Sequence, residues 1–255
     1  MVRRRRSGLT LIELIVVLVI LVGLAGIIIP MIPSMLGKVH TSAGATNMVE
    51  TDKWIEMYNQ SYFGYPNGWD SITDGKDVIS YLPLGDNGKT VSGQLTADKL
   101  SADEAKALKG IGIVNVHYLQ TAMPDSPTFN PYADKSTDPT PTTLDDKTVL
   151  AFLQPSVAHE QLGVSGSAKA RYIALGIGVR CTMIGNTAAE PPVLFSDQAE
   201  LNPALRYTRF AAIFQVADKD GAPRARFVGT LHIAQEGLHG VNAHLQEYYD
   251  AAKPQ

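Results

Sequence analysis

The hydrophobic pattern divides the chain into two very different parts. From Leu9 to Leu36, 28 residues contain a single ionisable side chain, Glu13, whereas beyond this segment polar and apolar residues alternate in short runs. At about 1.5 Å per helical residue, the run is long enough to cross the roughly 30 Å apolar thickness of a bilayer. It is too long for the apolar core of a secretory signal peptide, and no small-residue cleavage site follows it. The pattern predicts a transmembrane helix over residues 9–36.

An amphipathic pattern continues this helix over residues 37–63. The stretch Gly64–Gly68 (GYPNG) is a dense stop signal, so we expect one helix from Leu9 to about Tyr62. Its second half would lie on a globular head, with Trp54, Tyr58 and Tyr62 in the core. Apolar residues recur there at helical spacing: Val39, Ala43, Met48, Ile55, Tyr58 and Tyr62.

The head, residues 64–255, opens with few regular signals. Residues 64–95 are rich in glycine and aspartate and predict irregular structure. Ser101 and Glu104 form a capping box, which predicts a short helix ending at Gly110. A strand is predicted at 112–120, and five prolines among Asp and Thr predict an exposed loop over 124–147.

Strand signals dominate the C-terminal half. The segments are 148–153, 170–184, and a hairpin of 207–217 and 225–234 around the turn 218–223. Cys181 lies inside an apolar strand signal and is expected to be a buried thiol. The order of elements predicts an α+β fold, with a long N-terminal transmembrane and amphipathic helix packed on a C-terminal antiparallel β-sheet head.

The charge distribution excludes some partners and orients the chain. The net charge is −3, but four of the 22 basic residues are Arg3 to Arg6, which leaves 18 basic against 25 acidic residues elsewhere. A chain this acidic, without a Lys/Arg cluster beyond its start, is a poor candidate for binding nucleic acid. The arginines favour a cytoplasmic N-terminus, which places the head on the far side of the membrane.

Glu13 needs an explanation in this setting. A carboxylate near the middle of an apolar helix costs roughly 2.5 to 3.5 kcal/mol to insert. No lysine or arginine follows it before Lys38, so a compensating positive charge is expected from elsewhere. A buried charge of this kind favours an assembly that pairs it.

The residues around Glu13 carry a resemblance. Gly8 followed by Leu9-Thr-Leu-Ile-Glu13 and a long aliphatic run resembles the type III signal of type IV pilins and type II secretion pseudopilins. In that family a membrane peptidase cuts after the glycine and methylates the new amine. The resemblance implies a cut between Gly8 and Leu9, with 1–8 as the leader. Glu13 then becomes the fifth mature residue, where the family keeps a glutamate, and Pro30 takes the place of a helix-loosening proline.

The resemblance also implies a function. It predicts a non-enzymatic structural subunit of a type IV pilus-like or type II secretion pseudopilus filament, assembled through its N-terminal helix. Glu13 would pair with the methylated amine of Leu9 in a neighbouring subunit. Implied partners are copies of itself or other pseudopilins, the prepilin peptidase, an inner-membrane assembly platform and membrane lipid. The location would be the bacterial inner membrane, single-pass, with the head periplasmic or extracellular after assembly.

Two features of the head leave other functions open. It is larger than the head of a major pseudopilin, and with one cysteine it lacks the pair that closes the C-terminal loop of many adhesive pilins. The specific filament system is therefore open. The alternative is a membrane-anchored periplasmic or extracellular binding protein that carries a pilin-type leader but does not polymerise. An anchored hydrolase is a third class, for which no complete motif is present.

Fragments of catalytic motifs fail on inspection. Gly88-Lys89-Thr90 lacks the glycine that a phosphate loop requires at position 83, which is proline. Gly176 and Gly178 lack the third glycine of a dinucleotide motif, because position 181 is cysteine. The stretch 163–167 (GVSGS) ends in serine rather than the glycine of a nucleophile elbow.

Metal-binding candidates are few. His232, His239, His244 and Cys181 have no specific zinc spacing, so surface or core histidines are the plainer interpretation. Major pseudopilins as a class hold calcium in a head loop, and no aspartate run here has the spacing of an EF-hand. We expect no cofactor, with solvated turn carboxylates as the plainer interpretation of the calcium candidates Asp70, Asp74, Asp77, Asp134, Asp138, Asp218 and Asp220.

Overall fold

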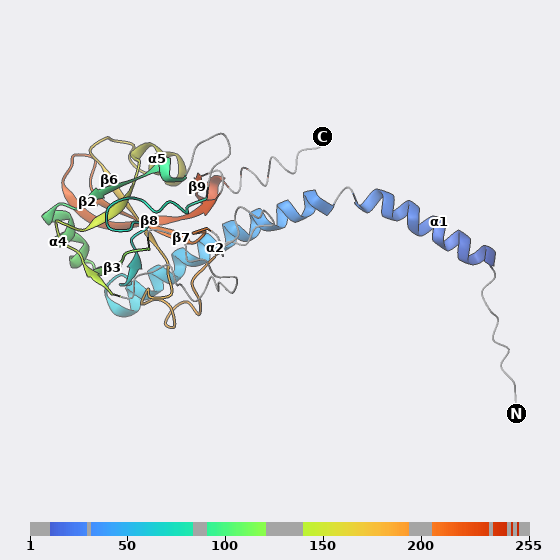
Figure 1. The fold of residues 1–255 in the computed structure, drawn as a ribbon, viewed down its shortest axis with the longest axis horizontal. Coiled ribbons are helices and arrows are strands. Elements are labelled where there is room, and N and C mark those ends of the chain that lie inside the picture. Colours follow the sequence, from blue (N-terminus) through green and yellow to red (C-terminus); the bar gives the residue numbers. More distant parts are fainter. Residues whose placement is uncertain are drawn as a thin grey trace, which may run out of the picture.

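The computed structural model describes residues 11–29, 32–83, 91–120, 140–193, 206–234, 237–243, 246 and 249. Two helices lead from the N-terminus into a mixed α+β head (Figure 1). The elements are α1 (Leu11–Ile28), α2 (Ile32–Tyr62), β1 (Trp69–Asp70), α3 (Val91–Gln94), β2 (Leu95–Lys99), α4 (Ala102–Gly110), β3 (Asn115–His117), β4 (Thr142–Thr143), β5 (Val149–Leu153), α5 (Pro155–Leu162), β6 (Arg171–Gly176), β7 (Phe210–Ala217), β8 (Pro223–Ala234) and β9 (Gly237–His239).

The long N-terminal helix is divided into α1 and α2, where the sequence predicted one continuous helix. Pro33 is the second residue of α2, a position in the first helical turn where proline is tolerated because its missing N–H has no helical partner. Pro30, between the two helices, lies outside the described residues. The C-terminal end at Tyr62 is as predicted. Phe63 follows it with a left-handed φ of 56° and is 96% exposed.

The sheet is mostly antiparallel, in the order β4-β3-β1-β6-β7-β8-β9, and β5 joins β2 to β6. Strands β5 and β1 lie end to end along one edge of β6, since β5 pairs with Tyr172–Ala174 and Asp70 pairs with Gly176. The pair β1 and β3 is parallel, so the sheet is mixed but mostly antiparallel, in agreement with the predicted fold class. This pairing brings Trp69 and Asp70 into the sheet, although residues 64–95 were expected to be irregular.

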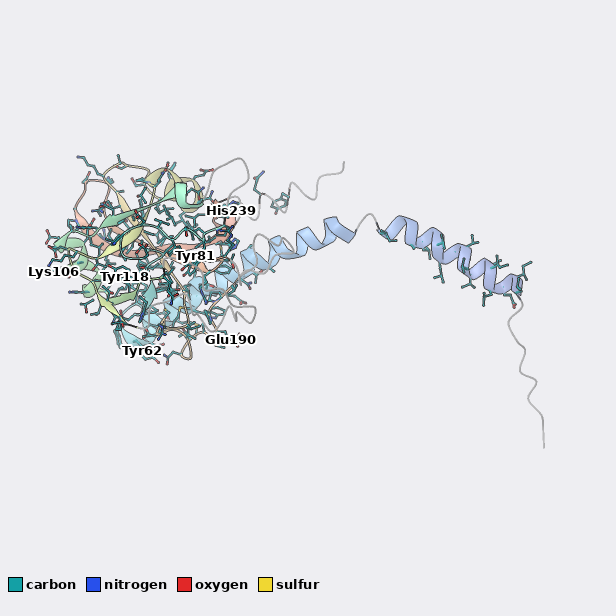
Figure 2. The ribbon with its side chains drawn as sticks, in the orientation of Figure 1. Tyr62, Tyr81, Lys106, Tyr118, Glu190 and His239 are labelled. Carbon is teal, nitrogen blue, oxygen red and sulfur yellow. The ribbon has the colours of Figure 1, made fainter. Side chains whose placement is uncertain are left out.

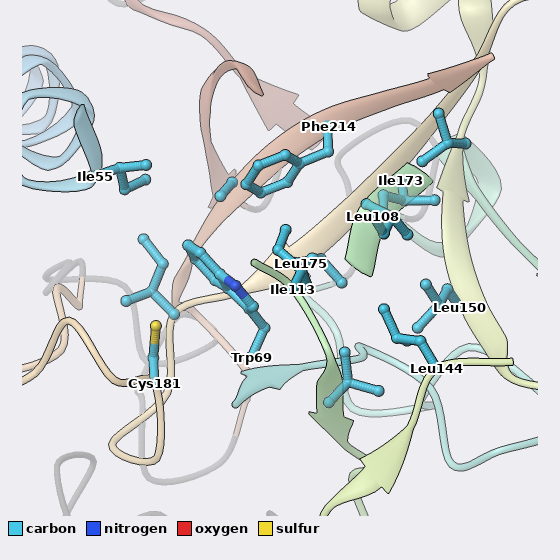
Figure 3. Close-up of a cluster of buried hydrophobic side chains, with 14 of the residues drawn as sticks. Ile55, Trp69, Leu108, Ile113, Leu144, Leu150, Ile173, Leu175, Cys181 and Phe214 are labelled. Atoms are coloured by element: carbon cyan, nitrogen blue, oxygen red, sulfur yellow. The ribbon is translucent and has the colours of Figure 1, made fainter. Parts of the chain in front are cut away.

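The sheet buries apolar side chains on both faces. Alternate residues of β7 enter different cores: Phe210 and Phe214 belong to one, whereas Ala211 and Ile213 belong to the other. The first core is covered by α2 and α4 and contains Trp69 and Cys181 (Figure 3). The second is covered by α5 and by the segment 72–82. The Gln94 side chain just before β2 accepts a 2.7 Å hydrogen bond from the backbone N–H of Leu238, so the start of β2 lies beside β9.

Several local predictions are confirmed. The hairpin β7–β8 forms around a turn in which Gly221 has φ 84°, and β5 occupies the predicted segment 148–153. Helix α4 begins with the expected capping box, in which the Ser101 hydroxyl accepts from the Glu104 N–H and the Glu104 carboxylate accepts from the Ser101 N–H. Cys181 is a buried free thiol, and burial raises its pKa.

Other predicted elements are shorter than expected or differ. The strand predicted at 112–120 is limited to β3, and the one at 170–184 ends at Gly176, beyond which residues 177–184 turn away. Of the predicted loop 124–147, residues 124–139 lie outside the described residues. Its last part forms β4 and buries Leu144, so that part is not an exposed loop. Helices α3 and α5 and strands β2 and β9 were not predicted.

The predicted aromatic row on α2 is only partly in the core. Trp54 and Tyr58 pack against the first core, but Tyr62 is 54% exposed because it ends the helix. Its ring stacks on Tyr58 with centroids 4.4 Å apart, and its hydroxyl donates to the side-chain oxygen of Asn186 at 3.1 Å.

A buried carboxylate stabilises the point where β6 ends. Asp70 is fully buried and accepts a 2.8 Å hydrogen bond from the Tyr207 hydroxyl. The backbone at Gly178 approaches this carboxylate so closely that a Cβ there would lie 2.5 Å from both oxygens. Gly176 is equally restricted, because a Cβ there would collide with the Tyr207 hydroxyl. The two glycines therefore let the chain leave β6 beside a buried, hydrogen-bonded acid.

Helix α2 is anchored on the sheet through one polar contact among apolar ones. Met48 and Ile55 are fully buried, and one turn from each the Asp52 carboxylate accepts a 2.5 Å hydrogen bond from the Thr230 hydroxyl of β8. Burial raises the pKa of Asp52, and the hydrogen bond from Thr230 opposes that rise without cancelling it. The ionised acid at this contact therefore costs stability while its hydrogen bond orients α2.

Replacing Tyr207 by phenylalanine should destabilise the head. The change removes a donor from a fully buried carboxylate, which costs about 1–3 kcal/mol in the free energy of unfolding. The measurement is urea unfolding of the full chain in detergent, followed by circular dichroism. Tyr65→Phe is the matched control, because the Tyr65 hydroxyl donates to Glu56 at 3.2 Å in a half-exposed setting. Equal losses for the two variants would contradict the role given to Asp70.

Asp52→Asn should remove a pH-dependent loss in the free energy of unfolding. Because the folded pKa of Asp52 is raised, the unfolded chain ionises first, and the stability contribution falls as pH rises above the ordinary aspartate value of about 4. The asparagine oxygen can still accept from Thr230. The difference in unfolding free energy between variant and parent should therefore shift in favour of the variant between pH 3 and pH 6. A pH-independent difference would argue against this, and Asp52→Ala, which also loses the hydrogen bond, is the comparison.

Candidate functional site

The first unusual surface is helix α1, which has no polar face. Its large apolar side chains from Leu11 to Leu24 are each between 49% and 77% exposed. Figure 2 shows α1 apart from the head, with side chains projecting from its sides. A helix that is apolar on every side is normally buried in a large core or in a membrane. In the isolated subunit, the described side chains of α1 are covered neither by a core nor by a membrane.

The free energy involved is large. Burying one valine, leucine or isoleucine side chain contributes about 1.5–3 kcal/mol, so covering the dozen on α1 would contribute on the order of 20 kcal/mol. That exceeds the typical net stability of a whole domain, about 5–15 kcal/mol. Whatever covers α1 therefore dominates the energetics of the chain.

Within the described residues, no helix is both long and apolar enough to cross a membrane. The predicted span of residues 9–36 includes positions 9, 10, 30 and 31, which lie outside the described residues.

Glu13 lies in the first turn of α1 and is the acidic residue of that turn. A negative charge at this position interacts favourably with the exposed N–H groups and the positive end of the helix dipole. The predicted processing residues Gly8 and Leu9 lie outside the described residues, as does Pro30. Glu13 is thus four residues after the predicted new N-terminus in the sequence, and that terminus is outside the described residues.

Helix α2 connects this apolar helix to the head. Its inner face packs on β8, and α1 extends beyond the head at its far end (Figure 1). Its outer face exposes Val49, Glu50, Lys53 and Met57. The apolar members of this row were not singled out from the sequence, because the polar residues between them gave α2 the pattern of an ordinary solvent-exposed face.

Three of the carboxylates proposed for calcium, those of Asp70, Asp74 and Asp218, accept hydrogen bonds from the protein itself. Asp70 is in the core with Tyr207, and Asp74 accepts from the backbone N–H groups of Lys76 and Asp77, which lowers its pKa. Asp218 accepts from the Lys219 N–H in the hairpin turn, beside Asp220. Asp134 and Asp138 lie outside the described residues.

The histidines and the cysteine likewise show no metal centre. His232 and His239 are opposite each other in the β8–β9 pair, and the His232 ring lies 5.4 Å from that of Phe210. Cys181 belongs to the first core, and His244 lies outside the described residues. Within the described part of the chain, no group of three or more His, Cys, Asp or Glu side chains could hold a metal ion.

Comparison with known families finds a match at the start of the chain. The prokaryotic N-terminal methylation motif matches residues 3–29, which include Gly8, Leu9 and Glu13. The chain therefore carries a prepilin-type cleavage and methylation signal, which is typical of type IV pilins and pseudopilins. No curated protein and no solved structure matches the chain.

The motif has implications for the processing, the location and the chemistry of the protein. It implies processing by a prepilin peptidase and a membrane-targeted protein of the envelope. Proteins with this signal are typically not enzymes. The α+β arrangement of N-terminal helices on a mostly antiparallel sheet is consistent with a pilin-like fold.

Proposed function

We propose that this chain is a structural subunit of a type IV pilus-like or type II secretion pseudopilus filament. In this proposal the precursor inserts into the bacterial inner membrane with its arginines in the cytoplasm, loses residues 1–8 and is methylated on Leu9. The chain then leaves the bilayer as it joins the filament through α1. The head remains on the periplasmic or extracellular side.

The observation that carries the proposal is the coincidence of the methylation motif with α1. Residues 3–29 match the motif, and α1, Leu11–Ile28, exposes apolar side chains on all sides. A single anchor in lipid needs such a helix, and so does a bundle of helices at the centre of a filament. The same surface can therefore serve the precursor in the membrane and the subunit in the polymer, with no change in its chemistry.

Glu13 supplies the specificity that an apolar surface lacks. Apolar packing tolerates sliding along the helix axis, whereas a charge in an apolar setting is stable only with its counter-charge in place. Cleavage after Gly8 creates an amine four residues before Glu13. The amine of one subunit paired with Glu13 of the next would fix the axial position of each incoming subunit. Pro30, between α1 and α2, would let the two helices adopt different directions in the polymer.

The partners follow from this sequence of events. They are the prepilin peptidase, an inner-membrane assembly platform, membrane lipid before assembly, and copies of the chain or other pseudopilins afterwards. An anchored binding protein that does not polymerise is the alternative, and it shares every step up to cleavage.

The first test is the intact mass of the protein extracted from membranes, with and without the prepilin peptidase. We expect a chain that begins at Leu9 and carries one methyl group when the peptidase is present, and the full precursor when it is absent. A chain beginning near Met1 in both strains would sink the proposal and leave α1 as an ordinary anchor.

Glu13→Gln should abolish assembly while leaving the protein in the membrane. The amide keeps the size of the side chain but removes the charge that pairs with the amine. Filaments sheared from cells are measured together with the mass of the membrane-extracted subunit, so that loss of cleavage is distinguished from loss of assembly. Glu160→Gln makes the same chemical change on the exposed surface of α5 and should leave filaments unchanged. Normal filaments with Glu13→Gln would disprove the pairing. Cleaved parent protein that forms no filaments would favour the non-polymerising alternative.

A further inference from the structure

The outer edge of β9 is capped by the side chains of two glutamines. The Leu238 N–H faces away from β8 and donates to the side-chain oxygen of Gln94 at 2.7 Å. Gly240, two residues further, directs its N–H to the same side of the chain and donates to the side-chain oxygen of Gln161 at 2.9 Å. These two donors are the ones that would begin a hydrogen-bonded ladder with a further strand, and both are occupied.

The local structure around β9 is built to hold these two glutamines. At Gly237 a Cβ would lie 2.6 Å from the side-chain nitrogen of Gln94, and at Gly240 a Cβ would collide with the backbone oxygen of Gln161. Any other residue at either position would therefore push a capping segment away from β9. The backbone oxygen of Gln94 accepts from the Gln154 N–H at 3.1 Å, directly before α5, the helix that carries Gln161. The two caps are thus fixed to each other through the start of α5.

Strand β2, at the other end of the run β2-β5-β6-β7-β8-β9, is capped in a similar way. Lys99 directs its backbone groups away from β5, because the next residue, Leu100, donates its N–H to the Thr148 oxygen. The Lys99 N–H donates to the Asp98 carboxylate at 2.8 Å, and the Lys99 C=O accepts from the Arg171 guanidinium at 3.0 Å. Side chains therefore occupy outward backbone groups at both ends of this run of strands.

The sequence of β9 contains none of the residues that usually protect an edge strand. Such strands commonly carry lysine, proline or an inward charge, whereas residues 237–240 read Gly-Leu-His-Gly. Without its caps, this edge would have a second copy of the chain as a suitable partner. Two identical edges can pair antiparallel about a two-fold axis, and each supplies the donors and acceptors that the other needs.

We propose that Gln94 and Gln161 protect the head against strand addition, by occupying the outward donors of β9 so that it cannot pair with β9 of a second copy. Pairing would first have to break both side-chain hydrogen bonds, so the exchange brings no net gain in hydrogen bonds. The inference concerns the head alone. It does not depend on how α1 is covered, and its failure would leave the proposed function intact.

The test is the double variant Gln94→Met/Gln161→Met of the full chain in detergent, compared with the parent. Methionine keeps the length of the side chain but lacks the amide oxygen. At low protein concentration, hydrogen exchange in the segment 237–243 should become about tenfold faster, as expected for loss of a hydrogen bond of ordinary strength. At high concentration, analytical ultracentrifugation should show a larger mass than that of the parent, and the segment should again be protected from exchange.

Gln154→Met is the matched control, because the Gln154 side chain donates to the Gly93 oxygen at 2.8 Å and makes no hydrogen bond to β9. It should match the parent in both measurements. Circular dichroism checks that the head remains folded, and each single variant provides the same comparison if the double variant does not fold. Unchanged exchange, or faster exchange without a gain in mass at any concentration, would overturn the inference. A gain in mass by the control would also overturn it, since association would then not depend on the edge of β9.

Discussion

The rest of the structure depends on one constraint: the apolar surface of α1 cannot be buried within the subunit. The head has filled both faces of its sheet with its own side chains and with α2, α4 and α5. Helix α1 extends beyond it, and its side chains gain nothing from the fold of the head. Under the proposed function, folding and assembly use separate surfaces. The stability of the head comes from two apolar cores, and the affinity of assembly would come from a helix that folding leaves exposed.

Helix α2 joins these two parts and meets different demands on its two faces. Its inner face is fixed by Met48, Ile55 and the Asp52–Thr230 hydrogen bond, which orient the helix on β8. In the proposed filament, a rigid attachment of α2 matters because the head of every subunit would have to take the same orientation on its helix. A buried acid is an expensive way to fix orientation, since burial raises its pKa. A hydrogen bond, however, specifies rotation about the helix axis, which apolar contacts alone do not.

The parts of the fold that sequence reasoning predicts are those that local pattern determines. The apolar run of α1, the capping box at Ser101 and the β7–β8 hairpin each follow from neighbouring residues. The errors occur where distant residues decide. Strand β6 ends at Gly176 because Tyr207 and Asp70, far away in sequence, occupy the adjacent space. Strand β1 forms through its pairings with β3 and β6, which lie far away in the sequence.

Some missed elements did have a local signal. Helix α5 has proline as its first residue and ends at Gly163 in the left-handed conformation, both of which are common helix boundaries. At the candidate site, the sequence alone singles out Glu13, because a lone carboxylate in an apolar run is rare. The exposure of Val49 and Met57 cannot be predicted from the sequence, since it depends on which face of α2 the sheet covers.

In the proposed filament, Glu13 illustrates why a subunit needs more than an apolar surface. Apolar burial is proportional to area and nearly indifferent to small axial shifts, so α1 alone would permit many arrangements of similar energy. A charge that is stable only beside its counter-charge selects among them at little cost to the total.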